Sequence, residues 1–117
     1  MRRRIGSIGA RRALALSIVA LAAWLSLTPR PPKPEVLPSR ADVAAHLVMH
    51  AGISGALAAA WPAATARAGA FGLALWLEAG QAQIEGRTFS LIDLAANVAG
   101  AALGLGAWRR LGAPRFG

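Results

Sequence analysis

The sequence predicts an all-α membrane protein: a four-helix antiparallel transmembrane bundle with its N- and C-termini in the cytoplasm. Three observations predict this fold. Apolar residues make up 56% of the 117 residues, above the ~45–50% typical of soluble domains, and the mean hydropathy is +0.46. These residues gather in four runs. Basic residues flank the runs on alternate connections, which is the pattern that the positive-inside rule describes for membrane proteins.

The chain begins with a basic segment, residues 1–12, which we expect to be cytoplasmic. The apolar run that follows, residues 13–28, is the expected first transmembrane helix, although a span usually needs ~20 residues. A basic start before a short apolar run also resembles a signal peptide, but no clear cleavage site follows, so an uncleaved helix is favoured. Residues 29–40 are rich in proline, which cannot continue a helix, and are expected to form an outer loop.

The remaining runs predict three further spans, at residues 41–61, 64–84 and 89–108. The dipeptide Trp61-Pro62 ends the second span, because proline disfavours helical geometry in the residue before it. Residues 85–88 form an outer turn. Both connections are short, so consecutive helices must be antiparallel neighbours. Trp61 and Trp108 fall at the inner membrane boundary, where tryptophans commonly lie, and residues 109–117 form a basic cytoplasmic tail.

The net charge of +8 does not indicate nucleic-acid binding, because the basic residues lie where a membrane topology requires them. Nine of them precede the first run, connect the second and third, or follow the fourth: Arg2, Arg3, Arg4, Arg11, Arg12, Arg67, Arg109, Arg110 and Arg115. The chain has no cysteine, which excludes disulfides, thiolate metal sites and a cysteine nucleophile. The charge pattern therefore predicts a protein that crosses a membrane several times.

Polar side chains lie inside three of the predicted spans, where ionisable groups are costly and indicate a site. At ~1.5 Å per residue, four of these side chains lie about 6 to 12 Å from the outer membrane boundary: His46, Glu78, Asp93 and Asn97. Three helices therefore bring them to one level. The predicted ligand-binding cluster is Asp42, His46, Glu78, Gln81, Arg87, Asp93 and Asn97. The expected ion pairs are Glu78–Arg87 and His46–Asp93.

Two of these acids also fit a structural role. Ser39-x-x-Asp42 and Ser90-x-x-Asp93 both match the helix N-terminal capping box, in which side chains accept hydrogen bonds from backbone N–H groups. Glu78 is harder to explain in this way, because an acid two turns inside a span needs a partner or a proton. A role in the site is therefore favoured for Glu78.

Other polar and small residues have alternatives of the same kind. Asn97 can hydrogen-bond a neighbouring helix, Arg87 can extend to the membrane interface, and His50 can pack as a neutral side chain. Gly100 and Gly104 continue the stripe of Asn97 along the fourth span and predict a close helix-packing surface. Oxygen and imidazole ligands for a metal ion are available on Asp42, His46, His50 and Glu78. The prediction nevertheless includes no metal, no cofactor and no catalytic residue.

The spacing E-x-x-Q…G-R-x-x-S-x-x-D-x-x-x-N-x-x-G-x-x-x-G resembles the signature of the VanZ-like membrane protein family. The residues that carry it are Glu78, Gln81, Gly86, Arg87, Ser90, Asp93, Asn97, Gly100 and Gly104. The earlier D-K-x-x-H motif of that family appears as Asp42-Val43-Ala44-Ala45-His46, with valine in place of lysine. His50 stands where an aromatic residue is usual. The resemblance covers roughly Asp42 to Gly104.

The resemblance implies a small multi-pass protein of the inner membrane, in a family whose name-giving member is linked to teicoplanin resistance. We therefore expect the cluster to bind an amphiphilic cell-envelope molecule, a lipid or lipoglycopeptide, near the outer leaflet, with Arg87 contacting an anionic group. Two alternatives stay open. One is an accessory subunit of a larger membrane complex, with the glycine stripe as its docking face. The other is a membrane enzyme acting on a lipid headgroup, with Glu78 or His46 as the acid–base group.

Overall fold

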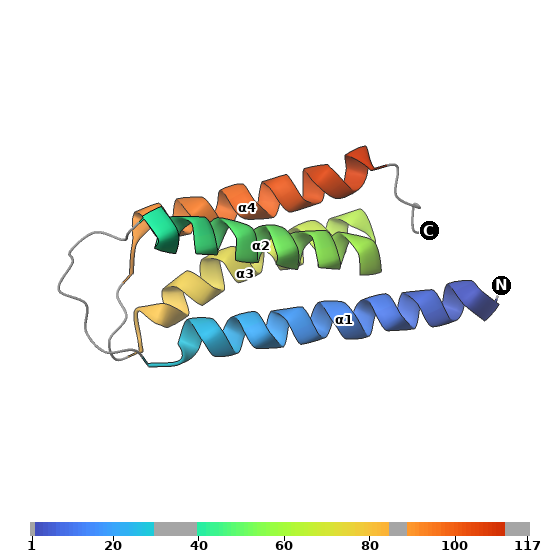
Figure 1. The fold of residues 1–117 in the computed structure, drawn as a ribbon, viewed down its shortest axis with the longest axis horizontal. Helices are drawn as coiled ribbons and strands as arrows, with labels where there is room; N and C mark the ends of the chain where they lie inside the picture. The colour runs from blue at the N-terminus through green and yellow to red at the C-terminus, as the bar shows by residue number, and fades with distance from the viewer. Residues whose placement is uncertain (1, 30–39, 85–88, 112–117) are drawn as a thin grey trace.

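Four α-helices make up the fold of the computed structural model (Figure 1). They are α1 (Arg2–Leu27), α2 (Arg40–Ala60), α3 (Ala63–Gln81) and α4 (Leu91–Arg110). The structure describes residues 2–29, 40–84 and 89–111, with side chains described from residue 8 onwards. The start of α1, the connection between α2 and α3, and the end of α4 share one end of the bundle (Figure 1). The end of α3 and the starts of α2 and α4 lie at the other.

Three of the described helices are long and apolar enough to cross a membrane: Ile8–Leu27, Arg40–Ala60 and Leu91–Arg110. The all-α prediction is therefore confirmed, and a membrane location agrees with the structure. α3 is not among the three. It carries Arg67, Glu78 and Gln81 within only 19 residues, and these lower its hydropathy.

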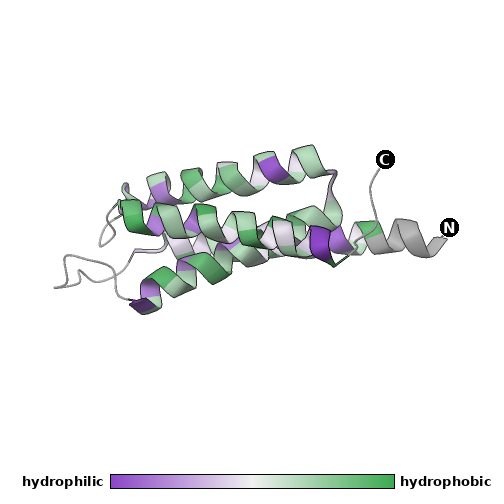
Figure 2. Cartoon of the chain, turned by 90° about the horizontal axis from the view of Figure 1, so that it is seen from above, coloured by the Kyte–Doolittle hydropathy of each residue, from purple (hydrophilic) through white to green (hydrophobic). Residues whose placement is uncertain are grey.

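Large apolar side chains point outwards and small ones point inwards, the reverse of the usual arrangement in a water-soluble bundle. Among the residues whose side chains the structure describes, eight of the eleven buried apolar ones are alanines; the three larger ones are Ile53, Leu57 and Leu77. Outward-facing residues on the four helices include Leu16, Trp24, Val48, Leu75, Trp76, Ile92 and Leu103. Most of the helical residues are hydrophobic, as the colouring of the cartoon in Figure 2 shows. Large apolar side chains on the outside suit hydrocarbon, while the small residues allow close helix packing.

The most extensive packing is between α2 and α4. A Cβ on Gly100 would overlap the backbone carbonyl of Leu47, and a Cβ on Gly104 would overlap Ser54 Oγ and the carbonyl of Ala51. Both glycines are buried. Glycine is therefore needed at these two positions for the backbones to lie this close together.

The helix boundaries differ from the prediction by a few residues at most positions. α1 begins at Arg2 rather than at residue 13, because arginine and alanine are good helix formers and extend the helix beyond the apolar run. α3 ends at Gln81, three residues before the predicted end, and α4 begins at Leu91 instead of residue 89. Arg67, which was expected in a connection, lies within α3. The predicted outer turn, and nearly all of the proline-rich loop and the tail, lie outside the described residues.

α1 is fastened to the rest of the bundle by two arginines that were expected only as topology signals. The Nε atom of Arg12 donates to the carbonyl of Ala60, the last residue of α2, at 3.1 Å. The guanidinium of Arg12 also lies 5.4 Å from the ring centroid of Trp61. Arg11 lies 5.8 Å from the ring centroid of Trp108. Both distances suit cation–π attraction, and a basic group is favourable at the carboxyl end of a helix.

Candidate functional site

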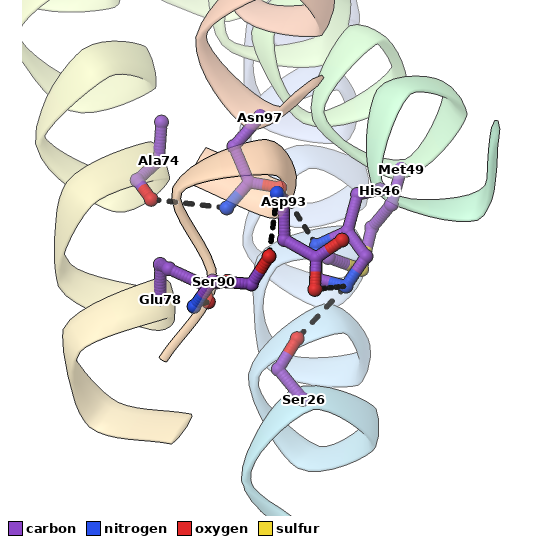
Figure 3. Close-up of polar contacts among 8 residues, drawn as sticks. All are labelled: Ser26, His46, Met49, Ala74, Glu78, Ser90, Asp93 and Asn97. Atoms are coloured by element: carbon purple, nitrogen blue, oxygen red, sulfur yellow. Dashed lines mark hydrogen bonds and ion pairs between the residues drawn. The ribbon is translucent and has the colours of Figure 1, made fainter. Parts of the chain in front are cut away.

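The polar side chains meet at the end of the bundle where α3 ends and α2 and α4 begin (Figure 3). His46 comes from α2, Glu78 from α3, and Asp93 and Asn97 from α4. Glu78 and Asn97 are fully buried or nearly so. The side chains of His46 and Asp93 keep 14% and 12% of their surface exposed, so the cluster is reached from its rim rather than sealed.

Asn97 holds three helices together. Its Nδ2 donates to the carbonyl of Ala74 in α3 at 3.1 Å, and its Oδ1 lies 2.8 Å from Nδ1 of His46 in α2. The bond to the carbonyl fixes which end of the amide is the nitrogen. The oxygen therefore faces the histidine, and Nδ1 of His46 must carry the hydrogen that this oxygen accepts.

Nε2 of His46 faces Oδ2 of Asp93 at 3.6 Å, which is the expected His46–Asp93 pair. This separation is too long for a direct hydrogen bond. Half of the predicted capping box is present: the backbone N–H of Asp93 donates to Oγ of Ser90 at 3.2 Å, whereas the backbone N–H of Ser90 donates to Glu78 and not to Asp93. Among the described residues, the buried Oδ1 atom of Asp93 has no hydrogen-bond partner.

Glu78 connects the end of α3 to the start of α4. Its Oε1 accepts a hydrogen bond from the backbone N–H of Ser90 at 2.8 Å. A carboxylate is favourable there, because a helix N-terminus carries partial positive charge. Glu78 thus has a structural role in addition to its place in the cluster. The expected partner, Arg87, lies outside the described residues.

Comparisons with known protein families, curated proteins and solved structures found no match. The VanZ-like resemblance therefore stays a prediction. What the chain can do must be argued from the geometry of the cluster itself.

The remaining predicted site residues surround this centre. Gln81 is buried one helical turn beyond Glu78, and Asp42 is partly buried one turn before His46. His50 is fully buried one turn deeper in α2, and within the part of the chain that the structure describes neither of its ring nitrogens has a hydrogen-bond partner. Among the described residues, His50 thus takes no part in the hydrogen bonding of the cluster. This agrees with the alternative in which it packs as a neutral side chain.

Ser54 is a buried polar residue that the sequence interpretation missed. Its Oγ donates to the carbonyl of Ala51 at 3.2 Å and lies 3.5 Å from the carbonyl of Gly100, against the glycine surface of α4. The signal was present in the spacing, since Ser54 continues the stripe of His46 and His50 by another four residues.

Three of the side chains are placed to bind one cation together. His46, Glu78 and Asp93 each offer one ligand atom, and these atoms lie within 4.8 Å of one another. One imidazole nitrogen with two carboxylate oxygens is a common donor set for divalent transition metals. The two acids of the set also make the described part of the cluster a good acceptor for hydroxyl and ammonium groups.

Proposed function

We propose that this chain is a four-span membrane protein whose polar cluster binds the head of an amphiphilic cell-envelope molecule at the outer face, the role that a VanZ-like protein would have. One observation carries the proposal. Three helices each bring polar side chains to the same end of the bundle, and two of those side chains keep an exposed edge there.

The orientation follows from charge. Arg11, Arg12, Arg67 and Arg109 lie towards the end of the bundle that is opposite to the cluster. The positive-inside rule assigns such an end to the cytoplasm. The cluster then faces the outer leaflet of the inner membrane, where the heads of envelope lipids and lipid-linked precursors lie.

α3 is the fourth span of this proposal, although it is not among the three described helices that are long and apolar enough to cross a membrane. Its 19 residues extend ~28 Å at ~1.5 Å each, close to the ~30 Å of a bilayer core. Its polar residues Glu78 and Gln81 are buried against the other helices, and Phe71, Leu75 and Trp76 face outwards. A helix that buries its polar groups in this way can cross a membrane.

The cluster sets the chemistry of the ligand. Its carboxylates and imidazole suit a head that carries hydroxyl or amine donors, as sugars and peptides do. Arg87, which lies outside the described residues, is assigned an anionic group of the ligand, such as a phosphate or carboxylate. The lipid tail of such a molecule remains in the bilayer beside the outward-facing apolar side chains.

The test is mild extraction of the full chain from its own membranes, followed by native mass spectrometry. We expect a defined amphiphile on the 12.0 kDa chain, and we expect the Arg87→Ala variant to lose it. Arg67→Ala is the matched control, because Arg67 is exposed on α3 far from the cluster. Loss of the amphiphile from both variants, or a chain that carries none, would contradict the proposal.

A second candidate, an accessory subunit of a larger membrane complex, is favoured by a groove of about 710 Å³ between α2 and α4. Its lining is almost wholly apolar and includes Gly52, Gly55, Leu103 and Trp108. The predicted docking face needs correction, because Gly100 and Gly104 are buried within the chain. The exposed Gly52 takes their place, since a Cβ there would meet nothing within 4 Å. Gly52→Leu should release partner proteins. Purification of the intact chain without any protein partner would exclude this candidate.

A further inference from the structure

We propose that His46, Glu78 and Asp93 form a binding site for a divalent first-row metal ion, with Zn²⁺ as the probe. The inference rests on the proposed function in one respect, because the metal ion is assigned to hold the head of the bound amphiphile. The three side chains come from three different helices, and one ligand atom of each lies within 4.8 Å of the others.

The hydrogen bonding of His46 prepares Nε2 as a ligand atom. Since Nδ1 donates to Asn97, neutral His46 presents a lone pair at Nε2. Metal-binding histidines in proteins almost always donate their other ring N–H to a carbonyl or carboxylate oxygen, which fixes the ring. Asn97 has this role here, and its own bond to Ala74 keeps it in place.

The facing atoms of His46 and Asp93 leave room for a cation between them. Nε2 as a lone pair and Oδ2 as a carboxylate oxygen are both acceptors, and they stand 3.6 Å apart. Zinc binds such atoms at ~2.0–2.2 Å, which places tetrahedral ligands about 3.4 Å from one another. The observed separation is close to this value. The third ligand atom, on Glu78, lies within 4.8 Å of these two.

The Asp93 carboxylate favours a metal ion at this place. It lies in a weakly polar surrounding, where an uncompensated charge is costly. A divalent metal would lie against this carboxylate and leave His46 neutral. The buried Oδ1 of Asp93, which has no hydrogen-bond partner among the described residues, is a further acceptor at the same place.

Three protein ligands leave one position of a tetrahedral metal open, as in catalytic zinc sites. The exposed edges of His46 and Asp93 place this position on the outer rim of the cluster. An oxygen donor of the ligand head, a phosphate, carboxylate or sugar hydroxyl, would complete the coordination. The site therefore binds an envelope molecule through a metal–oxygen bond.

The experiment uses the untagged full chain in detergent, stripped with a chelator and titrated with Zn²⁺ by calorimetry. We expect one Zn²⁺ per chain and an affinity at least tenfold lower for His46→Gln and for the near-isosteric Asp93→Asn. His50→Gln is the matched control, because the chain has two histidines and His50 packs outside the ligand set. Circular dichroism establishes that each variant is folded.

Binding of Co²⁺ gives a second readout, since tetrahedral Co²⁺ has strong visible absorption that His46→Gln should abolish. Absence of stoichiometric binding to the folded chain would overturn the inference. So would binding that both ligand variants leave unchanged. The two proposals fail separately: an amphiphile that depends on Arg87 in a chain that binds no metal overturns the metal site alone. A Zn²⁺ site in a chain that carries no amphiphile overturns the proposed function alone.

Discussion

Asn97 is the residue on which the cluster depends most. It is nearly fully buried and is the point at which α2, α3 and α4 are joined by side-chain hydrogen bonds. Buried amides between membrane helices are worth roughly 0.6 kcal/mol per bond, and up to ~1.7 kcal/mol. The same amide determines which nitrogen of His46 faces the acids. Its loss would therefore affect both stability and the chemistry of the site.

Replacing Asn97 with leucine should lower the free energy of unfolding by about 1–3 kcal/mol, because His46 Nδ1 and the Ala74 carbonyl lose their partner. Denaturation in mixed detergent micelles, followed by circular dichroism, measures the change. Val98→Leu is the control on the same helix, because Val98 is 41% exposed, and it should be within a few tenths of a kcal/mol. Equal stability of the two variants would show that Asn97 does not join the helices.

At the residue scale, spacing could predict the level of the polar groups but not all of their partners. The Ser90 cap follows from the capping rule. Helical rise places His46 and Asp93 at one level, but their pairing depends on how α2 and α4 face each other. The bond from Asn97 to the Ala74 carbonyl could not be predicted, because backbone acceptors leave no mark in a sequence. It depends on how far α3 and α4 are rotated about their axes.

At the scale of the helices, the contact between α2 and α4 sets how closely the bundle packs. Gly104→Ala should lower the free energy of unfolding by about 1–3 kcal/mol, since the added Cβ overlaps Ser54 and the Ala51 carbonyl and forces the helices apart. Gly106→Ala is the matched control. A Cβ at Gly106 meets nothing within 4 Å, so this variant should be unchanged or up to about 1 kcal/mol more stable. The same detergent unfolding measures both, and equal effects would exclude close packing at Gly104.

The presence of each helix could be predicted better than its length, or whether it is apolar enough to span a membrane. Trp61-Pro62 marked the end of α2 correctly, because proline acts through local geometry. The extension of α1 back to Arg2 was missed, since the apolar run, not the helix, was used to set its start. The polar residues of α3 look unfavourable for a span when they are counted along the sequence, whereas the structure buries Glu78 and Gln81 between helices.

At the scale of the whole molecule, the proposed topology is open to direct test because the chain has no cysteine. Single cysteines at Pro29 and Phe89, both exposed at the cluster end, should react with a membrane-impermeant maleimide in intact cells or spheroplasts. A cysteine at Ala63, exposed at the other end, should react only after permeabilisation. Reaction of Pro29→Cys and Phe89→Cys from opposite sides would exclude the four-span arrangement.

The order of the helices has a consequence for biosynthesis. Asp93 and Asn97 lie on α4, which leaves the ribosome later than α2, the helix that carries His46. During synthesis, His46 thus enters the membrane before the amide that accepts its hydrogen has been made. Arrival of α4 completes the cluster and inserts its glycines against α2 in the same event. Quality-control proteases that recognise polar groups exposed to lipid would therefore distinguish a chain that includes α4 from one arrested after α3.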